Sequence, residues 1–277
     1  MSLIEVKQIL DGKLVREGAG VKLHRYIGAD RSNDFEPVLL FDFFDSSEPM
    51  DYMGGFPSHP HRGFETITYM LDGKMMHQDN QGHQGVIGPG DVQWMTAGRG
   101  VIHSEMPAQL NGNLKGLQLW LNLPADAKMT SPHYQEFAAE KLPVEYHDSG
   151  LEIKVIAGTT ARGLSSPIHG IATEPLFLDI KLPLSQQLQQ PIAETHQAMI
   201  FVLSGMLLIH NQTIPAGQLA ILTAGDTLTM EALSSNTHFL LIAAKKLHEP
   251  IARLGPFVMS TQAEIFQAVD DFRNNRF

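Results

Sequence analysis

The chain has 277 residues, of which 43% are hydrophobic and 18% charged, which suffices for a buried core in one or two domains. Its formal net charge is −10 and no run of basic residues occurs, so direct binding to nucleic acid or to an anionic membrane is disfavoured. Cysteine is absent, which excludes disulfides and thiolate metal sites. Any metal must therefore be held by histidines and carboxylates.

The N-terminal stretch from Met1 to Arg16 alternates charged and apolar residues and lacks the continuous apolar core of a signal peptide. No stretch approaches the apolar length of a membrane span. We therefore expect a cytoplasmic protein without a membrane anchor.

Short β-type runs recur along the chain between turns rich in glycine, proline and aspartate. The earlier runs are Val21–Tyr26, Pro37–Phe44, Glu65–Leu71, Asp91–Met95, Gly116–Leu123 and Glu152–Ala157. The later runs are Leu176–Leu182, Ala198–Leu203, Met206–His210, Gln218–Leu222 and Thr237–Ala244. Many short strands of this kind predict an all-β sandwich or barrel.

The two halves of the chain have the same outline. A strand, a tight turn and a second strand are expected over residues 68–75, and again over residues 201–207. We interpret this repetition as a duplicated β-barrel, with a metal-binding barrel over residues 1–130 and a barrel without metal over residues 145–277. The linker is expected between Ala125 and Gly150, where three prolines interrupt regular structure.

One helix is expected at the C-terminal end. Ser260 or Thr261 can cap it, and an apolar stripe at helical spacing follows, made of Ile265, Phe266, Val269 and Phe272. A terminal helix docked on a sheet explains this pattern better than a partner-binding helix.

Two strings, His59-Pro60-His61 and His103-Ser104-Glu105, each place two metal ligands one residue apart. Alternate side chains of a strand point to the same face, so two facing strands of this kind would bring three imidazoles and one carboxylate around one point. An isolated His-x-His string more often marks surface histidines, but the second pair downstream favours a metal site. Pro60 predicts that the first string is at an edge or at the entry of a strand.

These strings lie in longer segments that resemble a known family. The segment from His59 to Thr66 is similar to the first signature of the pirins, a branch of the cupin superfamily. The segment from Gly90 to Pro107 resembles the second signature, and Gly255-Pro256-Phe257-Val258-Met259 resembles a third, weaker one. The resemblance spans nearly the whole chain.

The resemblance implies a bicupin, in which two consecutive antiparallel, jelly-roll-like β-barrels are followed here by a short C-terminal helix and only the first barrel holds metal. The family's ligands fall on His59, His61, His103 and Glu105. Relatives bind a non-haem iron, and some cleave the flavonol quercetin with dioxygen. Other members are described as transcriptional coregulators that bind protein partners.

A second carboxylate competes with Glu105. Glu65 lies four residues after His61 and fits the general cupin pattern, in which that glutamate is a ligand. It would share the face of His61 if the strand were unbroken. The pirin pattern favours Glu105 and puts Glu65 behind the ligands, while strand geometry alone leaves the choice open.

Further residues near the strings are candidates for a pocket or for support of the ligands. The candidates that line a substrate pocket or pack in the core are Phe56, Trp94 and Met95. Arg62 and Arg99 would bind a substrate oxygen, hold Glu105 or form surface ion pairs.

Asp42 lies in an apolar run and needs a partner, so it would orient a ligand histidine or make a turn contact. His77 and His83 lie in a polar, glycine-bearing segment and are expected to be solvated.

Three imidazoles and a carboxylate suit iron, and also nickel, manganese, copper or zinc. On an octahedral ion they leave two positions open for chemistry. The leading hypothesis is a dioxygenase that acts on quercetin or a similar flavonol, with a small aromatic substrate and dioxygen as partners and Glu105 as the proton acceptor. The alternative is a metal- or redox-responsive regulatory protein that acts through a protein partner. A metal-storing or vestigial barrel is a third option.

Overall fold

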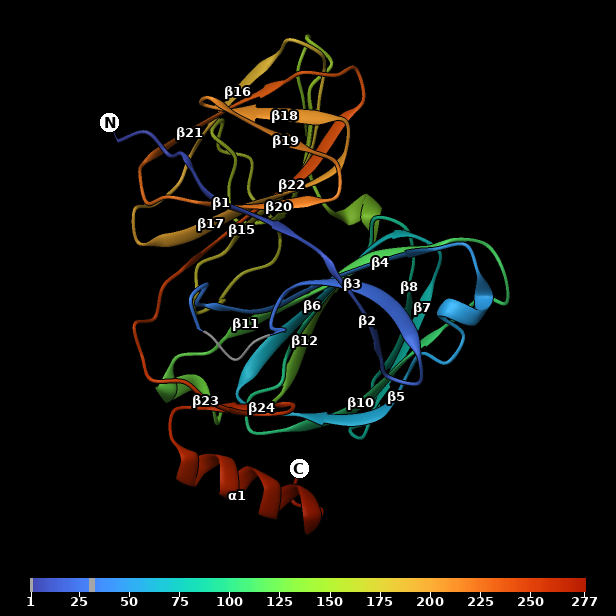
Figure 1. The fold of residues 1–277 in the computed structure, drawn as a ribbon. Coiled ribbons are helices and arrows are strands. Elements are labelled where there is room, and N and C mark those ends of the chain that lie inside the picture. The colour runs from blue at the N-terminus through green and yellow to red at the C-terminus, as the bar shows by residue number, and fades with distance from the viewer. Residues whose placement is uncertain (1, 30–32) are drawn as a thin grey trace. The chain divides into compact units, whose positions relative to one another are not determined.

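The computed structural model describes residues 2–29 and 33–277 (Figure 1). The chain forms two compact units. The first unit comprises Lys13–Ala139 and Leu247–Phe277, and the second unit comprises Met1–Gly12 and Glu140–Lys246. Each unit is built from antiparallel strands, which confirms the all-β, two-barrel fold.

The first unit pairs a seven-stranded sheet with a four-stranded sheet. The larger sheet has the order β12-β9-β6-β11-β4-β3-β2, with the bounds β2 Lys13–Glu17, β3 Val21–Ile27, β4 Val38–Ser46, β6 Phe64–Asp72, β9 Val92–Thr96, β11 Leu114–Asn122 and β12 His133–Phe137. The smaller sheet has the order β5-β10-β7-β8, with the bounds β5 Phe56–His61, β7 Met75–Asp79, β8 Gln84–Ile87 and β10 Val101–Pro107. A hairpin of β23 Ala252–Leu254 and β24 Phe257–Met259 precedes the helix α1 Gln262–Arg273.

The second unit repeats this plan. Its larger sheet has the order β1-β20-β17-β22-β15-β14-β13, with the bounds β1 Val6–Asp11, β13 Val144–Tyr146, β14 Glu152–Ala157, β15 Leu176–Leu182, β17 His196–Ser204, β20 Gln218–Leu222 and β22 Thr237–Lys245. Its smaller sheet has the order β16-β21-β18-β19, with the bounds β16 Gln187–Pro191, β18 Met206–Ile209, β19 Gln212–Pro215 and β21 Thr227–Ala232. Short 3-10 turns occur at Pro49–Asp51, Ala125–Ala127 and Ala139–Lys141.

The burial of the strands follows from their sequence pattern. Strand β4 is apolar from Val38 to Phe44 except for Asp42, and it is buried on both faces over these residues. Strand β10 alternates, and its buried positions include His103 and Glu105. The inward face of the smaller sheet in the first unit is therefore the face that carries the candidate ligands.

The division into units differs from the expected boundaries at both ends of the chain. Strand β1 pairs with β20, so the N-terminal segment completes the larger sheet of the second unit. Strand β12 occupies the same position beside β9 in the first unit. The boundary at Ala139 lies within the expected linker, but the last 31 residues, Leu247–Phe277, belong to the first unit rather than the second.

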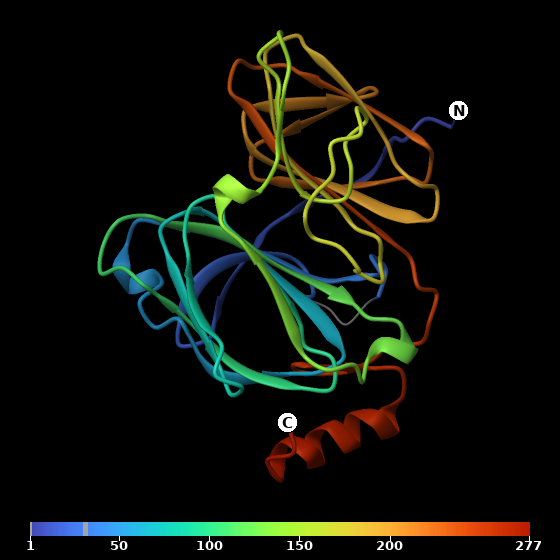
Figure 2. The same cartoon turned by 180° about the vertical axis from the view of Figure 1, so that it is seen from behind.

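Helix α1 begins after Thr261, as expected, and packs on the β23–β24 hairpin (Figures 1 and 2). Thr261 and Glu264 cap each other's backbone N–H groups in a capping box. Ile265 and Ala268 are buried against Phe257 and Met259. The expected apolar stripe was wrong at Phe266, which is 64% exposed.

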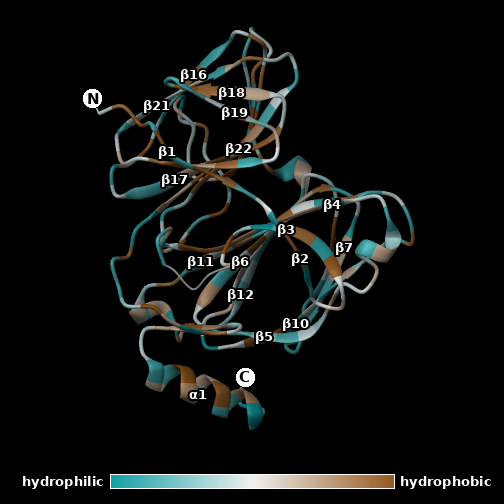
Figure 3. Cartoon of the chain, viewed as in Figure 1, coloured by the Kyte–Doolittle hydropathy of each residue, from teal (hydrophilic) through white to brown (hydrophobic). Residues whose placement is uncertain are grey.

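The hydropathy view shows apolar and polar stretches alternating along α1 (Figure 3). Across the described residues, no helix has the length and apolar character needed to cross a membrane.

Candidate metal centre

Two neighbouring strands of the smaller sheet bring the three histidines together. Strands β5 and β10 pair antiparallel, with His59 opposite His103 and His61 opposite Val101. One ring nitrogen from each of the three histidines lies within 4.8 Å of the others. His61 and His103 are each 2% exposed, and His59 is half-buried at the edge of the cluster.

The hydrogen bonds of His59 indicate which of its nitrogens is free to bind a metal. Its Nδ1 lies 2.8 Å from the carbonyl oxygen of Pro57. A carbonyl only accepts, so Nδ1 carries the proton and Nε2 keeps its lone pair. That Nε2 lies 3.1 Å from Nε2 of His103. Two nitrogens bound side by side to one ion at about 2.1 Å would be about 3 Å apart, so the spacing fits a shared metal.

The other ring nitrogens also fit a metal centre. Both nitrogens of His61 and Nδ1 of His103 are buried without a hydrogen-bond partner among the described residues. Burial lowers the pKa of His61 well below its ordinary value and lowers the pKa of His103 to about 4. Neutral imidazoles are the form that a metal requires, so this cluster can hold a divalent ion.

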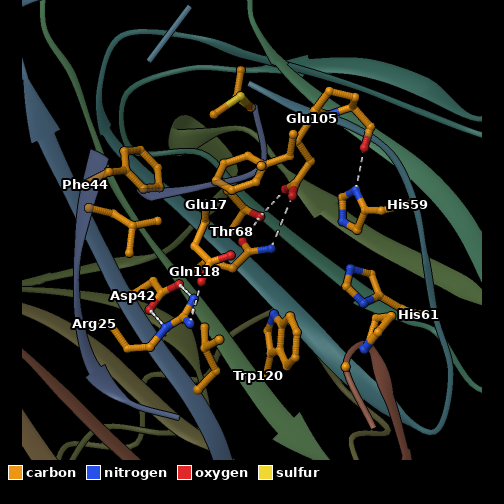
Figure 4. A pocket seen from close by; sticks show the side chains of 18 of the residues that line it. Glu17, Arg25, Asp42, Phe44, His59, His61, Thr68, Glu105, Gln118 and Trp120 are labelled. Carbon is orange, nitrogen blue, oxygen red and sulfur yellow. Dashed lines mark hydrogen bonds and ion pairs between the residues drawn. The ribbon is translucent and has the colours of Figure 1, made fainter. Parts of the chain in front are cut away.

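Glu105 lies two residues after His103 on β10 and lines the same cavity as His59 and His61. Its Oε1 lies 3.0 Å from the hydroxyl of Thr68, and its Oε2 accepts a hydrogen bond of 3.4 Å from the amide of Gln118 (Figure 4). Thr68 and Gln118 face each other across β6 and β11. These two side chains hold the carboxylate at the cavity wall.

Glu65 has different surroundings. It is three residues from Thr68 on β6, so the two side chains point to opposite faces of the strand. Thr96 donates a 2.7 Å hydrogen bond to its carboxyl group. Burial raises the pKa of Glu65 to about 7. The cavity lining includes Glu105 and does not include Glu65.

A cavity of about 430 Å³ opens beside the histidines, within the usual size range of small-molecule sites. Its apolar walls include Leu23, Leu40, Phe44, Phe56, Met75 and Trp120. His59, His61 and Glu105 lie on one side of it, and Glu17, Arg25 and Asp42 lie on the other (Figure 4). All of these residues belong to the first unit.

Of the other residues predicted near the site, some line the cavity and some do not. Phe56 lines the cavity, but Trp94 and Met95 are fully buried in the sheet and do not line it. Asp42 lines the cavity but bonds to Arg25 and not to a histidine. His77 is 5% exposed and lies 3.1 Å from Glu136, so the expectation that it is solvated was wrong.

The two arginines next to the ligand strings do not reach the cavity. Arg62 is 3% exposed, and its guanidinium pairs with Asp271 of α1 at 2.7 Å. Its Nε donates to the carbonyl oxygen of Arg99, whose own side chain is exposed. Arg62 therefore connects the strand end beside His61 to the C-terminal helix. Its ion pair with Asp271 is buried on the Arg62 side, so it is not the surface ion pair that the sequence suggested.

Sequence reasoning missed Thr68, Gln118, Arg25 and Trp120 as cavity residues. Polar side chains inside apolar strands are the signal for the first two, because a buried polar group needs a partner. For Arg25 the sequence indicates only that a partner is needed, because the partner itself is set by the pairing of β3 with β4.

Comparison with known proteins gives a consistent result. Residues 20–121 match the family model described as Pirin, and residues 177–277 match the one described as Pirin C-terminal cupin domain. A pirin-like protein of Caulobacter vibrioides is 45% identical over 100% of both chains. Human pirin is 43% identical, covering 93% of this chain and 88% of the human protein.

Among solved structures, a quercetin 2,3-dioxygenase from Acinetobacter baumannii superimposes with a TM-score of 0.91. It is 32% identical and the match covers 100% of this chain and 99% of the other. The two family models, the relatives at 43–45% identity and the duplicated 7-plus-4 sheets together show that the chain belongs to the pirin family of cupin proteins.

Proposed function

We propose that this protein is a metal-dependent dioxygenase that acts on quercetin or a similar flavonol. The observation that carries the proposal is the group of three mutually close imidazoles, two of them buried, beside a cavity with apolar walls. The likeness to the Acinetobacter quercetin 2,3-dioxygenase over the whole chain supports it. We propose His59, His61, His103 and Glu105 as ligands of one divalent metal, iron first, with nickel, manganese, copper or zinc as alternatives.

A metal held there would supply a Lewis acid and a template for the substrate's oxygens and for dioxygen. The protein's own contribution begins with Glu105. We propose that its carboxylate accepts the proton of the flavonol hydroxyl, since it faces the cavity and its position is fixed by Thr68 and Gln118. The hydroxyl of Thr68 has one hydrogen, and Gln118 Oε1 lies 2.5 Å from it. That hydrogen can turn from the carboxylate to the amide when Glu105 takes up the proton.

The cavity walls would position the substrate and exclude water. Trp120 and Phe44 add aromatic surfaces to the cavity wall, and Figure 4 shows Trp120 between His61 and Arg25. Fused aromatic rings pack well against such surfaces, and the water they displace would otherwise compete for protons.

A cytoplasmic location of the protein stays a prediction.

Oxygen uptake tests the proposal. The protein is reconstituted with Fe²⁺ without oxygen, freed of excess metal and mixed with quercetin and dioxygen. We expect uptake well above that of free iron, and its loss in His59→Ala and Glu105→Gln. His133→Ala is the matched control, because His133 is an exposed histidine of β12 outside the cavity. No uptake above free iron, or full uptake by His59→Ala, would overturn the proposal.

The same assay separates this proposal from a regulatory role. A regulatory protein would bind its partner with an affinity that depends on the metal, and it would show no turnover of any flavonol.

A further inference from the structure

The end of the cavity away from the histidines carries charged groups. Arg25 forms two parallel bonds with Asp42, from Nε to Oδ1 at 2.8 Å and from Nη2 to Oδ2 at 2.7 Å. Its Nη1 donates to Glu17 at 2.7 Å. We call Glu17, Arg25 and Asp42 the Arg25 cluster. It lies across the cavity from His59 and His61, with Trp120 between the two ends (Figure 4).

Packing alone does not explain the Arg25 cluster. The side chain of Asp42 is 6% exposed and that of Arg25 16% exposed, so most of this ion pair is out of water. Burying two charges costs free energy that their attraction returns only in part, and apolar residues would fill the same space at no such cost. The pairing of β3 with β4 is irregular between Arg25 and Ile27. Irregularities of this kind often direct a side chain towards a site.

The Arg25 cluster has capacity left for a ligand. A guanidinium has five N–H donors, and the bonds to Asp42 and Glu17 use three of them. Glu17 uses Oε1 for Arg25, and its side chain is 41% exposed. Within the described residues, donors of Arg25 and an acceptor of Glu17 therefore remain available beside each other.

We propose that the Arg25 cluster recognises hydroxyl groups on the end of the substrate that is remote from the metal. A phenolic hydroxyl can donate to the carboxylate of Glu17 and accept from Arg25, and two neighbouring hydroxyls can use both groups at once. The ligand class is a flat aromatic molecule with a chelating oxygen pair at one end and a catechol at the other. The inference rests on the proposed function for the position of the chelating end.

Binding of two flavonols tests this inference. Quercetin carries the catechol, whereas galangin (3,5,7-trihydroxyflavone) has the same fused rings, chelating hydroxyl and ketone and lacks only the two catechol hydroxyls. Titration calorimetry without oxygen, on the metal-loaded protein, gives both Kd values in the absence of turnover. We expect the wild type to bind quercetin about tenfold more tightly than galangin, as a hydrogen bond to a charged group would give.

Glu17→Gln removes the charge of the acceptor with little change in size and at a part-exposed position. It should weaken quercetin binding about fivefold to tenfold and leave galangin binding within twofold. Arg25→Lys keeps the positive charge, loses the fork and should have the same selective effect. Glu48→Gln is the matched control, because Glu48 is exposed and outside the cavity. Thermal unfolding shows that each variant is folded.

Equal binding of the two flavonols by the wild type, or no binding of quercetin, would overturn the inference. So would equal weakening of both ligands in Glu17→Gln. Selective weakening supports it even if no variant consumes oxygen, in which case the dioxygenase proposal alone fails. Turnover of quercetin without any selectivity in Glu17→Gln would remove the inference and leave the dioxygenase proposal in place.

Discussion

The two barrels have the same strand order but different interiors. Strands β5 and β10 of the first unit correspond in sheet position to β16 and β21 of the second. In the first unit these strands carry the histidines beside a cavity. In the second unit their inward residues include Leu188, Leu228 and Met230, which are buried in one apolar core.

This difference separates what the fold provides from what the residues provide. The topology supplies two paired strands with alternating inward positions in both units. His61 and His103 at those positions give buried nitrogens that have no hydrogen-bond partner among the described residues, whereas leucine and methionine give close packing. We therefore expect substitutions at the two places to have different effects, on metal binding in one unit and on stability in the other.

Removing a histidine should have the largest effect on metal affinity, because the first interior then lacks a ligand, as the second does. We expect His61→Ala to lower metal affinity more than 100-fold, since loss of a supporting residue alone costs about 10- to 100-fold. Calorimetric titration with Fe²⁺ or Zn²⁺ measures this, with His133→Ala as the control. Unchanged affinity in His61→Ala would show that the cluster is not a metal site.

The next largest effect should distinguish Glu105 from Glu65, because only one of the two carboxylates lines the cavity. Glu105→Gln should reduce flavonol turnover by about 10²- to 10⁴-fold, the usual contribution of a positioned base, and should weaken metal binding. Glu65→Gln should retain metal, because that side chain points away from the cavity face of β6. Metal content and initial rates of both variants check this. The reverse pattern would make Glu65 the ligand.

A core substitution in the second unit should affect stability without affecting metal. Leu228→Ala removes a fully buried side chain and should lower the free energy of unfolding by about 2–5 kcal/mol. Urea denaturation measures the loss, and metal titration below the transition should give the wild-type affinity. A loss of metal affinity comparable to that of His61→Ala would contradict the separation of the two interiors.

The smallest effect concerns pH. The folded-state pKa of Glu65 is about 7, above its ordinary 4.5, so between these values the folded protein keeps a proton that the unfolded chain has lost. The free energy of unfolding should therefore fall as pH rises through this window, by about 3 kcal/mol from this group. Glu65→Gln removes this loss of stability, because glutamine does not ionise.

Urea denaturation of chelator-treated protein at pH 5 and pH 8 measures this term. Glu65→Gln should gain about 2.5 kcal/mol over the wild type on going from pH 5 to pH 8, because the two proteins differ in this group alone and unfolded Glu65 is already largely ionised at pH 5. A difference that does not depend on pH would mean that Glu65 is ionised in the folded state.

Local sequence predicts the strands that are buried on both faces. Leu176–Leu182 agrees with β15 at both ends, since its apolar run has one interpretation. Strand β16, with the sequence QLQQP, was missed because one apolar residue gives no periodic signal. Strand β1 belongs to the second unit and the C-terminal segment Leu247–Phe277 to the first. The sequence did not predict this, because β1 pairs with β20, more than two hundred residues away.

The candidate site follows the same rule. The histidines were predictable because each string lies within three residues on one strand. The partner of Arg62 is Asp271, 209 residues away, and the partner of Arg25 is fixed by strand register. Charged residues of this kind show that a partner is needed, but only the fold identifies it.

The metal content of the whole chain tests the central claim most directly. After reconstitution and removal of free metal, elemental analysis should give one divalent ion per wild-type chain and none in the double variant His59→Ala/His61→Ala, with thermal unfolding showing that the variant is folded. A full equivalent retained by the folded double variant, or two per wild-type chain, would contradict a single metal centre in the first unit.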